Sequence, residues 1–306
     1  MKYAVSANMV LVSFPRPSFS IPLPGGRALS LGHRTLVMAI VNVTPDSFAD
    51  GGERFDPDKA IADAIRMVDE GADILDIGGE STRPGAPAVD EAEELRRVLP
   101  VLEGLRGRVG VPISIDTYKA SVAEQAVALG AAIVNDISAL ANDPAMAGVV
   151  ARTGAAAVLM HNRGRSADIY QFAQYTDVIA QIRADLAARV AVAEQAGIGR
   201  GQLILDPGFG FAKRAEHSLE ALARLGELHD LHLPILSGPS RKSFLRLALG
   251  DVPPSERVWG TAAAVTASIM AGAHIVRVHD VGLMVQVARV ADSIRRAARY
   301  ERAAAR

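Results

Sequence analysis

Short apolar runs recur along the chain, and each ends in polar residues. The first run, residues 36–41, leads into Asn42 and the segment Val43-Thr44-Pro45-Asp46-Ser47-Phe48. A run of this length is typical of a strand that is buried on both faces, and it is too short for an independent helix. Similar runs follow at residues 74–77, 112–115, 132–134, 156–160, 203–205, 234–236 and 274–278. The pattern therefore predicts eight strands, each with polar residues at its C-terminal end.

Longer amphipathic stretches lie between these runs, with apolar residues three and four positions apart. This spacing predicts helices, most clearly at residues 58–70, 91–105, 121–129, 177–195 and 258–271. Several of the stretches stop at a glycine, which readily takes the left-handed conformation that ends many helices. Eight alternations of strand and helix over about 270 residues fit one closed (β/α)8 TIM barrel. A doubly wound open sheet is the alternative fold.

The residues before the first predicted barrel strand form a separate element. Residues 18–31 hold Pro24-Gly25-Gly26 between two short β-like runs, a pattern that predicts a β-hairpin. We expect this hairpin to plug the N-terminal end of the barrel. The predicted divisions are an N-terminal extension (1–35), the barrel (36–296) and a C-terminal tail (297–306). The Ala- and Arg-rich C-terminal end, from Arg295 onward, is expected to fray.

The composition narrows the class of protein. A net charge of −1 with mixed signs argues against a general nucleic-acid-binding surface. The chain has no cysteine, which excludes disulfides and thiolate metal sites and is compatible with a reducing cytoplasm, where we place the protein. We find neither an export signal nor an apolar run long enough to span a membrane, so we expect a soluble protein.

Three polar segments suit an anionic group. Residues 78–85 combine hydroxyls, a guanidinium and backbone amides on a glycine-rich loop, although a solvated loop is the simpler interpretation of this segment alone. Residues 237–244 place two cations beside small residues, before an apolar helix predicted to begin near Phe244. Arg277 and His279 share one face of the last strand. In a barrel these groups would meet on one rim, where a diphosphate fits.

Two carboxylates also follow apolar runs, Asp116 and Asp206. In a cavity, each can accept two hydrogen bonds from a flat donor array such as the edge of an amino-pyrimidine ring. General acid or base chemistry is equally open. The structural alternatives are that Asp116 caps the helix that follows it and that Asp206-Pro207-Gly208 is simply a turn.

Metal chemistry is limited by the ligands that the sequence offers. Asn42 and Asn135 are neutral, so neither indicates a strong all-protein metal cage. Asn42 together with phosphate oxygens and water would suit Mg²⁺, which needs few protein ligands. His161 and His279 are too isolated to indicate zinc.

Six motifs, taken together and in order, resemble the dihydropteroate synthase family. They are Asn42-Val43-Thr44-Pro45-Asp46-Ser47-Phe48, Leu75-Asp76-Ile77-Gly78-Gly79-Glu80-Ser81-Thr82-Arg83-Pro84-Gly85, Ser114-Ile115-Asp116-Thr117-Tyr118-Lys119, Asp206-Pro207-Gly208-Phe209-Gly210-Phe211, Ser240-Arg241-Lys242 and Arg277-Val278-His279-Asp280-Val281. The resemblance spans about Leu36 to about Ile294. It implies a folate-pathway transferase that joins 4-aminobenzoate to (7,8-dihydropterin-6-yl)methyl diphosphate and releases diphosphate. The product would be 7,8-dihydropteroate.

The resemblance also implies roles for individual residues. The pterin would be held by Asp116, Asn135, Met160, Asp206 and Lys242. The diphosphate would be held by Arg83, Arg277, His279 and, as the Mg²⁺ ligand, Asn42. Thr82 and Gly238 would lie near the substrates, and the 4-aminobenzoate pocket, where sulfonamides compete in this family, would be bordered by Phe211, Ser240 and Lys242. The residues implied in catalysis are Asp116, Lys242, Arg277 and His279.

The implied mechanism begins with ionisation of the C–O bond to a pterin-stabilised methylene cation, which the arylamine then attacks. No protein nucleophile is needed. Asp116 would favour the electron-deficient pterin, while the Arg, His and Mg²⁺ cluster would stabilise the departing diphosphate.

Two departures from the family pattern affect the 4-aminobenzoate pocket. Ala212 stands where the family usually has glycine, and residues 161–166 lack the usual methionine after the histidine and the proline after the glycine. Both departures fall on predicted rim loops, so they bear on sulfonamide sensitivity more than on the pterin site.

Two other functions compete with the synthase. A pterin-dependent methyltransferase would share the barrel and the pterin carboxylates but would not need the diphosphate-binding set. A non-catalytic pterin-binding paralogue would be expected to have lost some loop residues, and none is missing here. A homodimer is the family expectation, with residues 258–271 as a candidate contact that core packing explains equally well.

Overall fold

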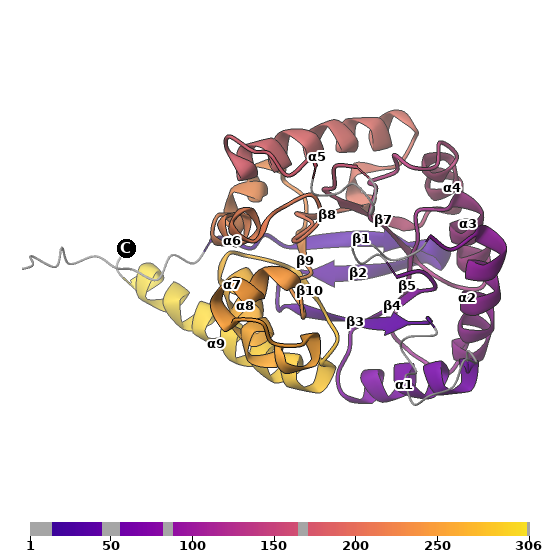
Figure 1. The fold of residues 1–306 in the computed structure, drawn as a ribbon, viewed down its shortest axis with the longest axis horizontal. Helices are drawn as coiled ribbons and strands as arrows, with labels where there is room; N and C mark the ends of the chain where they lie inside the picture. The colour runs from indigo at the N-terminus through magenta and orange to yellow at the C-terminus, as the bar shows by residue number, and fades with distance from the viewer. Residues whose placement is uncertain (1–13, 45–55, 82–87, 165–170, 305–306) are drawn as a thin grey trace, which may run out of the picture.

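A closed barrel of parallel strands forms the body of the computed structural model, which describes residues 14–44, 56–81, 88–164 and 171–304 (Figure 1). The barrel strands are β3 (Leu36–Asn42), β4 (Ile74–Gly78), β5 (Ile113–Asp116), β6 (Ile133–Asp136), β7 (Ala156–Met160), β8 (Leu203–Asp206), β9 (Leu236–Ser237) and β10 (Ile275–Val278). They are neighbours in the order β8-β7-β6-β5-β4-β3-β10-β9. A parallel bridge between Leu205 and Ile235 closes the ring. This closure confirms the predicted barrel and excludes the open sheet.

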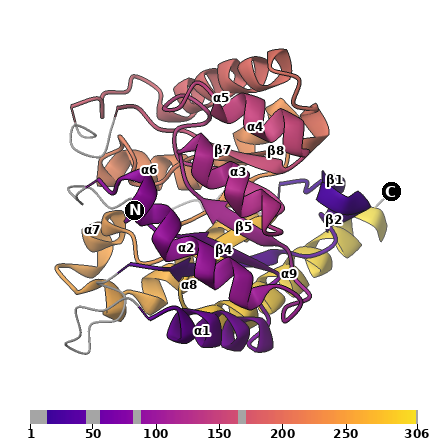
Figure 2. The same ribbon diagram turned by 90° about the vertical axis from the view of Figure 1, so that its right-hand side faces the viewer.

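Helices surround the barrel on the outside (Figures 1 and 2). They are α1 (Pro57–Asp69), α2 (Glu91–Leu105), α3 (Ala120–Ala128), α4 (Met146–Thr153), α5 (Val178–Gln195), α6 (Ala215–Ala223), α7 (Arg246–Leu249), α8 (Val258–Met270) and α9 (Val281–Ala304). The five helices predicted by range are confirmed to within one residue at each end. Asp56, Asp90 and Asp177 begin α1, α2 and α5 by accepting hydrogen bonds from first-turn amides. Among the described residues, no helix is long and apolar enough to cross a lipid bilayer.

The barrel strands are buried on both faces, as their apolar runs predict. Along β8, for example, Leu203 and Leu205 pack against the surrounding helices, whereas Ile204 points into the barrel. Asp206 continues the inward-facing set at the end of the strand. This period-two alternation therefore decides which residue at each strand end faces the central cavity.

The hairpin of β1 (Phe19–Leu23) and β2 (Arg27–Leu31) plugs the N-terminal end of the barrel, as predicted. Gly25 and Gly26 make the connection with φ of 74° each, a conformation that glycine adopts without strain. Ile21 and Leu31 are each 1% exposed and pack with inward-facing strand residues such as Met38. Figure 2 shows the hairpin at the end opposite α7, so the other end is left for the site.

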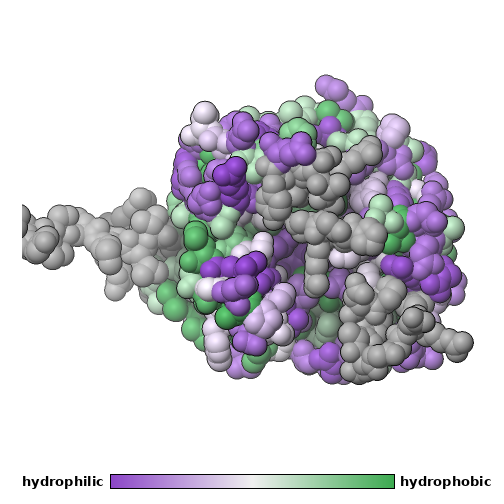
Figure 3. Space-filling model, viewed as in Figure 1, coloured by the Kyte–Doolittle hydropathy of each residue, from purple (hydrophilic) through white to green (hydrophobic). Residues whose placement is uncertain are grey.

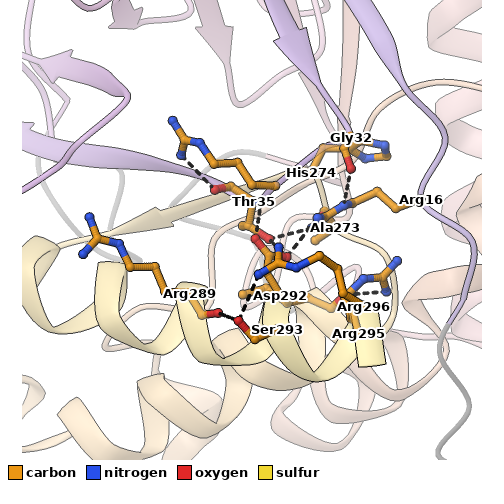
Figure 4. A network of polar contacts seen from close by, with 12 residues as sticks. Arg16, Gly32, Thr35, Ala273, His274, Arg289, Asp292, Ser293, Arg295 and Arg296 are labelled. Carbon is orange, nitrogen blue, oxygen red and sulfur yellow. Dashed lines mark hydrogen bonds and ion pairs between the residues drawn. The ribbon is translucent and has the colours of Figure 1, made fainter. Parts of the chain in front are cut away.

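A buried ion pair fastens the N-terminal extension to α9 (Figure 4). Arg16 Nη2 lies 2.9 Å from Asp292 Oδ1, and the two side chains are 4% and 5% exposed. Thr35 donates its backbone N–H to Asp292 Oδ2 at 2.6 Å and accepts from Arg16 Nη1. Nearby, Arg295 is 3% exposed and donates to the carbonyl of Ile269. Arg295 is therefore held in place, contrary to the expectation that fraying starts there, because composition alone does not reveal these partners; the frayed tail at 297–306 stays a prediction.

Candidate active site

The polar residues at the strand ends meet on one rim of the barrel, as the alternation requires. They border two adjoining cavities, a narrow one and a larger one of about 300 Å³. The residues that line both are Asp116, Phe211, Gly238, Lys242 and Arg277. The narrow cavity also contains Asn135, Met160 and Asp206, whereas the larger one contains Asn42, Ser240 and His279. These side chains, up to 237 positions apart in the sequence, therefore share one site.

Arg277 joins two buried carboxylates from neighbouring strands. Its Nε lies 2.5 Å from Asp76 Oδ2, and its Nη2 lies 2.6 Å from Asp116 Oδ2. Asn135 donates from Nδ2 to Asp76 Oδ2 at 2.9 Å. Burial lowers the pKa of the guanidinium, but the two carboxylates outweigh this effect and the net shift of the Arg277 pKa is upward. The arginine is therefore a permanent positive charge at the centre of the site.

Asp116 is poised to accept hydrogen bonds from a ligand. Burial raises its pKa against the opposing effect of Arg277, and Asp76 raises it further. Its second oxygen, Oδ1, is buried and has no hydrogen-bond partner among the described residues. Gly78 lies beside it, where an added Cβ would come within 3.3 Å of the Asp116 Cβ. The helix-cap alternative is wrong, because α3 begins at Ala120 and Asp116 points into the cavity instead.

Asp206 both stabilises a turn and faces the cavity, the two roles that the sequence left as alternatives. Its Oδ1 accepts a hydrogen bond from the backbone N–H of Gly208 at 2.7 Å, which fixes the turn. The side chain is buried in the narrow cavity, where desolvation raises its pKa. A carboxylate held in this way presents its remaining lone pairs toward the cavity.

Cationic and hydroxyl groups line the other side of the site. Lys242 Nζ lies 4.1 Å from the centre of the Phe211 ring, a cation–π contact. The Ser240 hydroxyl is 3.0 Å from His279 Nδ1 and accepts a hydrogen bond from the His279 backbone N–H. Arg241 is paired with Asp280. Lys242, Ser240, His279 and Arg277 thus place positive charge and donors around the larger cavity.

The helix predicted to begin near Phe244 is shorter than expected. Ser243–Leu245 is a 3-10 turn, and α7 adds only four residues. So short a helix contributes little macrodipole, and the positive charge here comes from side chains. Two predicted residues, Thr82 and Arg83, lie outside the described residues. Among the described residues, no cluster of three or more His, Cys, Asp or Glu side chains forms a metal cage.

Comparisons with known proteins place the chain among pterin-binding barrel enzymes. The family model "Pterin binding enzyme" matches residues 38–279. The dihydropteroate synthase of Synechocystis is 48% identical over 277 residues, which cover 90% of this chain and 96% of the relative. The Xanthomonas albilineans synthase with 4-aminobenzoic acid superposes with a TM-score of 0.83 at 43% identity, covering 90% of this chain and 98% of that one. The same synthase in complex with 7,8-dihydropteroate gives a TM-score of 0.80 at 40% identity, with coverages of 89% and 98%.

The chain belongs to the dihydropteroate synthase family. It is therefore an enzyme, a transferase that acts on a pterin group.

Sequence reasoning left one central residue without a role, Asp76. This side chain is fully buried and contacts both Arg277 and Asn135. It stands between Leu75 and Ile77 in an apolar run, and we assigned that run to the buried strand alone. The available signal was the charge itself, since an unpaired carboxylate is costly inside a strand that is buried on both faces.

Proposed function

We propose that this enzyme joins 4-aminobenzoate to (7,8-dihydropterin-6-yl)methyl diphosphate, giving 7,8-dihydropteroate and diphosphate. One observation carries this assignment. Two buried carboxylates, Asp116 and Asp206, flank a narrow cavity that opens into a larger cavity lined by Arg277, Lys242 and His279. A flat donor-rich ring fits the first compartment, and a polyanion with an arylamine fits the second.

The pterin ring is held edge-on by the buried polar groups. Asp116 and Asp206 accept hydrogen bonds from its N–H groups, and Asn135 supplies a neutral partner between them. Met160 packs with Phe211 and Ile137 against the ring faces. The negative charge of Asp116, buried in the narrow cavity, stabilises positive charge that develops on the pterin.

The departing diphosphate takes the C–O bonding electron pair and is stabilised by Arg277, His279 and Lys242 at the rim. The resulting methylene cation is then attacked by the amine of 4-aminobenzoate, and a C–N bond forms. The nitrogen loses a proton to solvent. Phe211, Ser240 and Lys242 border the compartment in which the arylamine lies. Arg83 and Thr82 complete the diphosphate-binding set in this proposal.

Mg²⁺ fits this site only as an ion that arrives with the substrate. Asn42 offers one amide oxygen, is partly exposed and lines the larger cavity, and the described residues supply no carboxylate cage around it. A single neutral ligand suits Mg²⁺, which keeps several waters and binds substrate phosphates. When bound, Mg²⁺ would neutralise part of the charge on the leaving group.

Replacing Asn42 by alanine should raise the Mg²⁺ concentration needed for half-maximal rate by about tenfold, with much of the rate recovered at saturating Mg²⁺. Calorimetry of pterin diphosphate binding at varied Mg²⁺ provides a readout independent of turnover. Asn142→Ala, at an exposed position that lines neither cavity, is the matched control. An unchanged Mg²⁺ dependence in both measurements would remove Asn42 as the ligand.

The direct test of the proposed function is product analysis with purified enzyme. Dihydropteroate and diphosphate should form in equal amounts, and only when both substrates are present. Binding of the pterin without product would favour the non-catalytic paralogue. Transfer of a methyl group would favour the pterin-dependent methyltransferase, for which the diphosphate-binding residues have no use.

We also propose that the enzyme is a cytoplasmic homodimer. Large apolar side chains are exposed on α7, α8 and α9: Leu247, Trp259, Leu283, Val290 and Ile294. Trp259 is 78% exposed and Val290 is 61% exposed. Figure 3 shows hydrophobic surface gathered on the side of the molecule that carries α8 and α9. A patch of this kind suits the self-complementary interface of a two-fold dimer, and the cysteine-free sequence is compatible with the cytoplasm.

Val290→Glu should convert the dimer to a monomer, because it places a charge in the centre of an apolar interface. Light scattering coupled to size-exclusion chromatography measures the mass directly. Val192→Glu introduces the same change on α5, where Val192 is also exposed, and should leave the mass unchanged. A wild-type protein with the mass of one chain would contradict the dimer.

A further inference from the structure

A buried lysine lies just behind the cavity wall. Lys213 is 2% exposed and is not among the residues that line either cavity. Its Nζ lies 2.8 Å from His161 Nδ1 and 3.0 Å from each of the carbonyl oxygens of Gly208 and Phe211. The carbonyl oxygen of His161 is a fourth acceptor at 3.4 Å, so the acceptors outnumber the three N–H groups that the amine can carry at most. Nothing in the proposed reaction uses this amine.

The histidine beside it is fixed in one tautomer. Burial and the neighbouring lysine lower the pKa of His161 to about 4, so the ring is neutral near pH 7. Its Nε2 lies 3.0 Å from Asp185 Oδ2, an acceptor, and therefore carries the proton. Nδ1 is left to accept from Lys213. Arg163 donates to the same carboxylate of Asp185, which lies on α5. Lys213 therefore donates to His161, and His161 in turn donates to Asp185.

The main chain held by Lys213 is tightly curled. Gly208, Gly210 and Ala212 all have positive φ, and the value of 47° at Ala212 is costly for a residue with a Cβ. The Gly208 carbonyl accepts from the Phe211 N–H as well as from Lys213. Tyr175 donates its hydroxyl to the Ala212 carbonyl at 3.0 Å. Without Lys213 and Tyr175, the carbonyls of Phe211 and Ala212 would lose these hydrogen-bond donors.

This loop places Phe211 at the boundary between the two cavities. The ring is 7% exposed, lines both cavities and lies beneath Lys242 Nζ. Lys213 donates a hydrogen bond to the carbonyl oxygen of Phe211. A shift of the Phe211 main chain would therefore move the ring that separates the pterin compartment from the larger cavity, while Asp116 and Asn135 lie on other strands.

We propose that Lys213 is a positioning residue, whose amine holds the Phe211 main chain and thereby sets how tightly the arylamine binds. The role rests on the proposed function, in which Phe211 borders the 4-aminobenzoate compartment. Ala212 and His161 lie at the two places where the sequence departs from the family pattern. In this proposal both belong to the hydrogen-bonded structure that holds the Phe211 main chain.

Lys213→Met keeps an unbranched side chain of nearly the same length and removes the donors. The expected result is a KM for 4-aminobenzoate about tenfold higher, with kcat within about twofold of wild type and a clearly smaller rise in the KM for the pterin diphosphate, whose compartment Phe211 also lines. Asp292→Asn is the control for a general loss of stability, since it weakens a buried pair beside Thr35, just before β3 begins and so at the end of the barrel away from the site. It should change neither KM.

Tyr175→Phe tests the same support with less risk to folding, because it removes one donor to the neighbouring carbonyl of Ala212. It should raise the same KM by a smaller factor. In a double-mutant cycle with Phe211→Leu, the effect of Lys213→Met on this KM should largely disappear. Fully additive effects would show that Lys213 does not act through Phe211.

The outcomes separate this role from the proposed function. A wild-type enzyme that makes dihydropteroate, together with an unchanged KM for 4-aminobenzoate in Lys213→Met and Tyr175→Phe, would overturn the role alone. Equal losses for both substrates would also overturn it, because they indicate a purely structural lysine. A wild-type enzyme that makes no dihydropteroate would overturn the proposed function, and this role with it.

Discussion

Asp116→Asn should lower turnover about a thousandfold, the cost typical of removing one preorganised electrostatic group from an active site. The substitution keeps the shape of the side chain and removes its charge. Asp116 lies in the narrow cavity with an unpaired oxygen, so the loss falls on the cation that develops on the pterin. Steady-state kinetics with saturating substrates measures the effect.

The same variant should change the free energy of unfolding little. Burial raises the pKa of Asp116, which means that its ionised form costs stability in the folded state. Urea denaturation separates this effect from catalysis. An unchanged turnover would show that the carboxylate has no part in the reaction.

The pH dependence carries an independent signature of Asp116. Since its pKa is raised, the group takes up a proton above the usual aspartate range as the pH falls. Pterin binding requires the ionised form, so kcat/KM for the pterin diphosphate should decline at a higher pH than an ordinary carboxylate would cause. Asp116→Asn should abolish this part of the profile.

Arg277→Gln should damage both stability and activity. The guanidinium is the charged partner of Asp76, which is fully buried, and of Asp116. Its removal leaves two buried carboxylates uncompensated, at a cost of about 3 kcal/mol or more in the free energy of unfolding. The loss of its charge at the leaving group should lower kcat/KM by about a thousandfold.

A second substitution distinguishes these two effects. Asp76→Asn in the Arg277→Gln background removes one of the stranded charges, so it should restore part of the stability without restoring activity. Arg152→Gln, at a solvent-exposed arginine paired with Glu124, is the control and should change neither quantity by much. Recovery of activity along with stability would mean that Arg277 serves only to hold the fold.

The barrel could be predicted from the sequence because its strands are buried on both faces. The apolar runs at residues 36–41 and 203–205, for example, locate β3 and β8 to within one residue at each end. The helices could be predicted equally well, since their apolar positions keep the helical spacing. The burial of Arg295 could not be predicted, because its partners are the carbonyls of Phe14, Ile269 and Met270, which lie far away in the sequence.

The candidate site was predictable where side chains end a strand, as with Asp116, Asp206 and Arg277. Period-two alternation and the shared rim of a barrel bring such residues together. Asp76 and Lys213 escaped prediction for a different reason. The partners of Asp76, Arg277 and Asn135, lie two strands away on either side of β4. Lys213 contacts His161 at the end of another strand, and local sequence does not reveal such long-range pairs.

The decisive measurement is diphosphate formation in a single turnover, with enzyme in excess and no 4-aminobenzoate present. If the C–O bond ionises before the arylamine attacks, diphosphate should appear after rapid quenching, and the same step should be nearly absent in Asp116→Asn. If the wild-type enzyme forms no diphosphate until 4-aminobenzoate is added, the arylamine displaces the leaving group directly. That result would contradict ionisation within the Asp116 and Arg277 site.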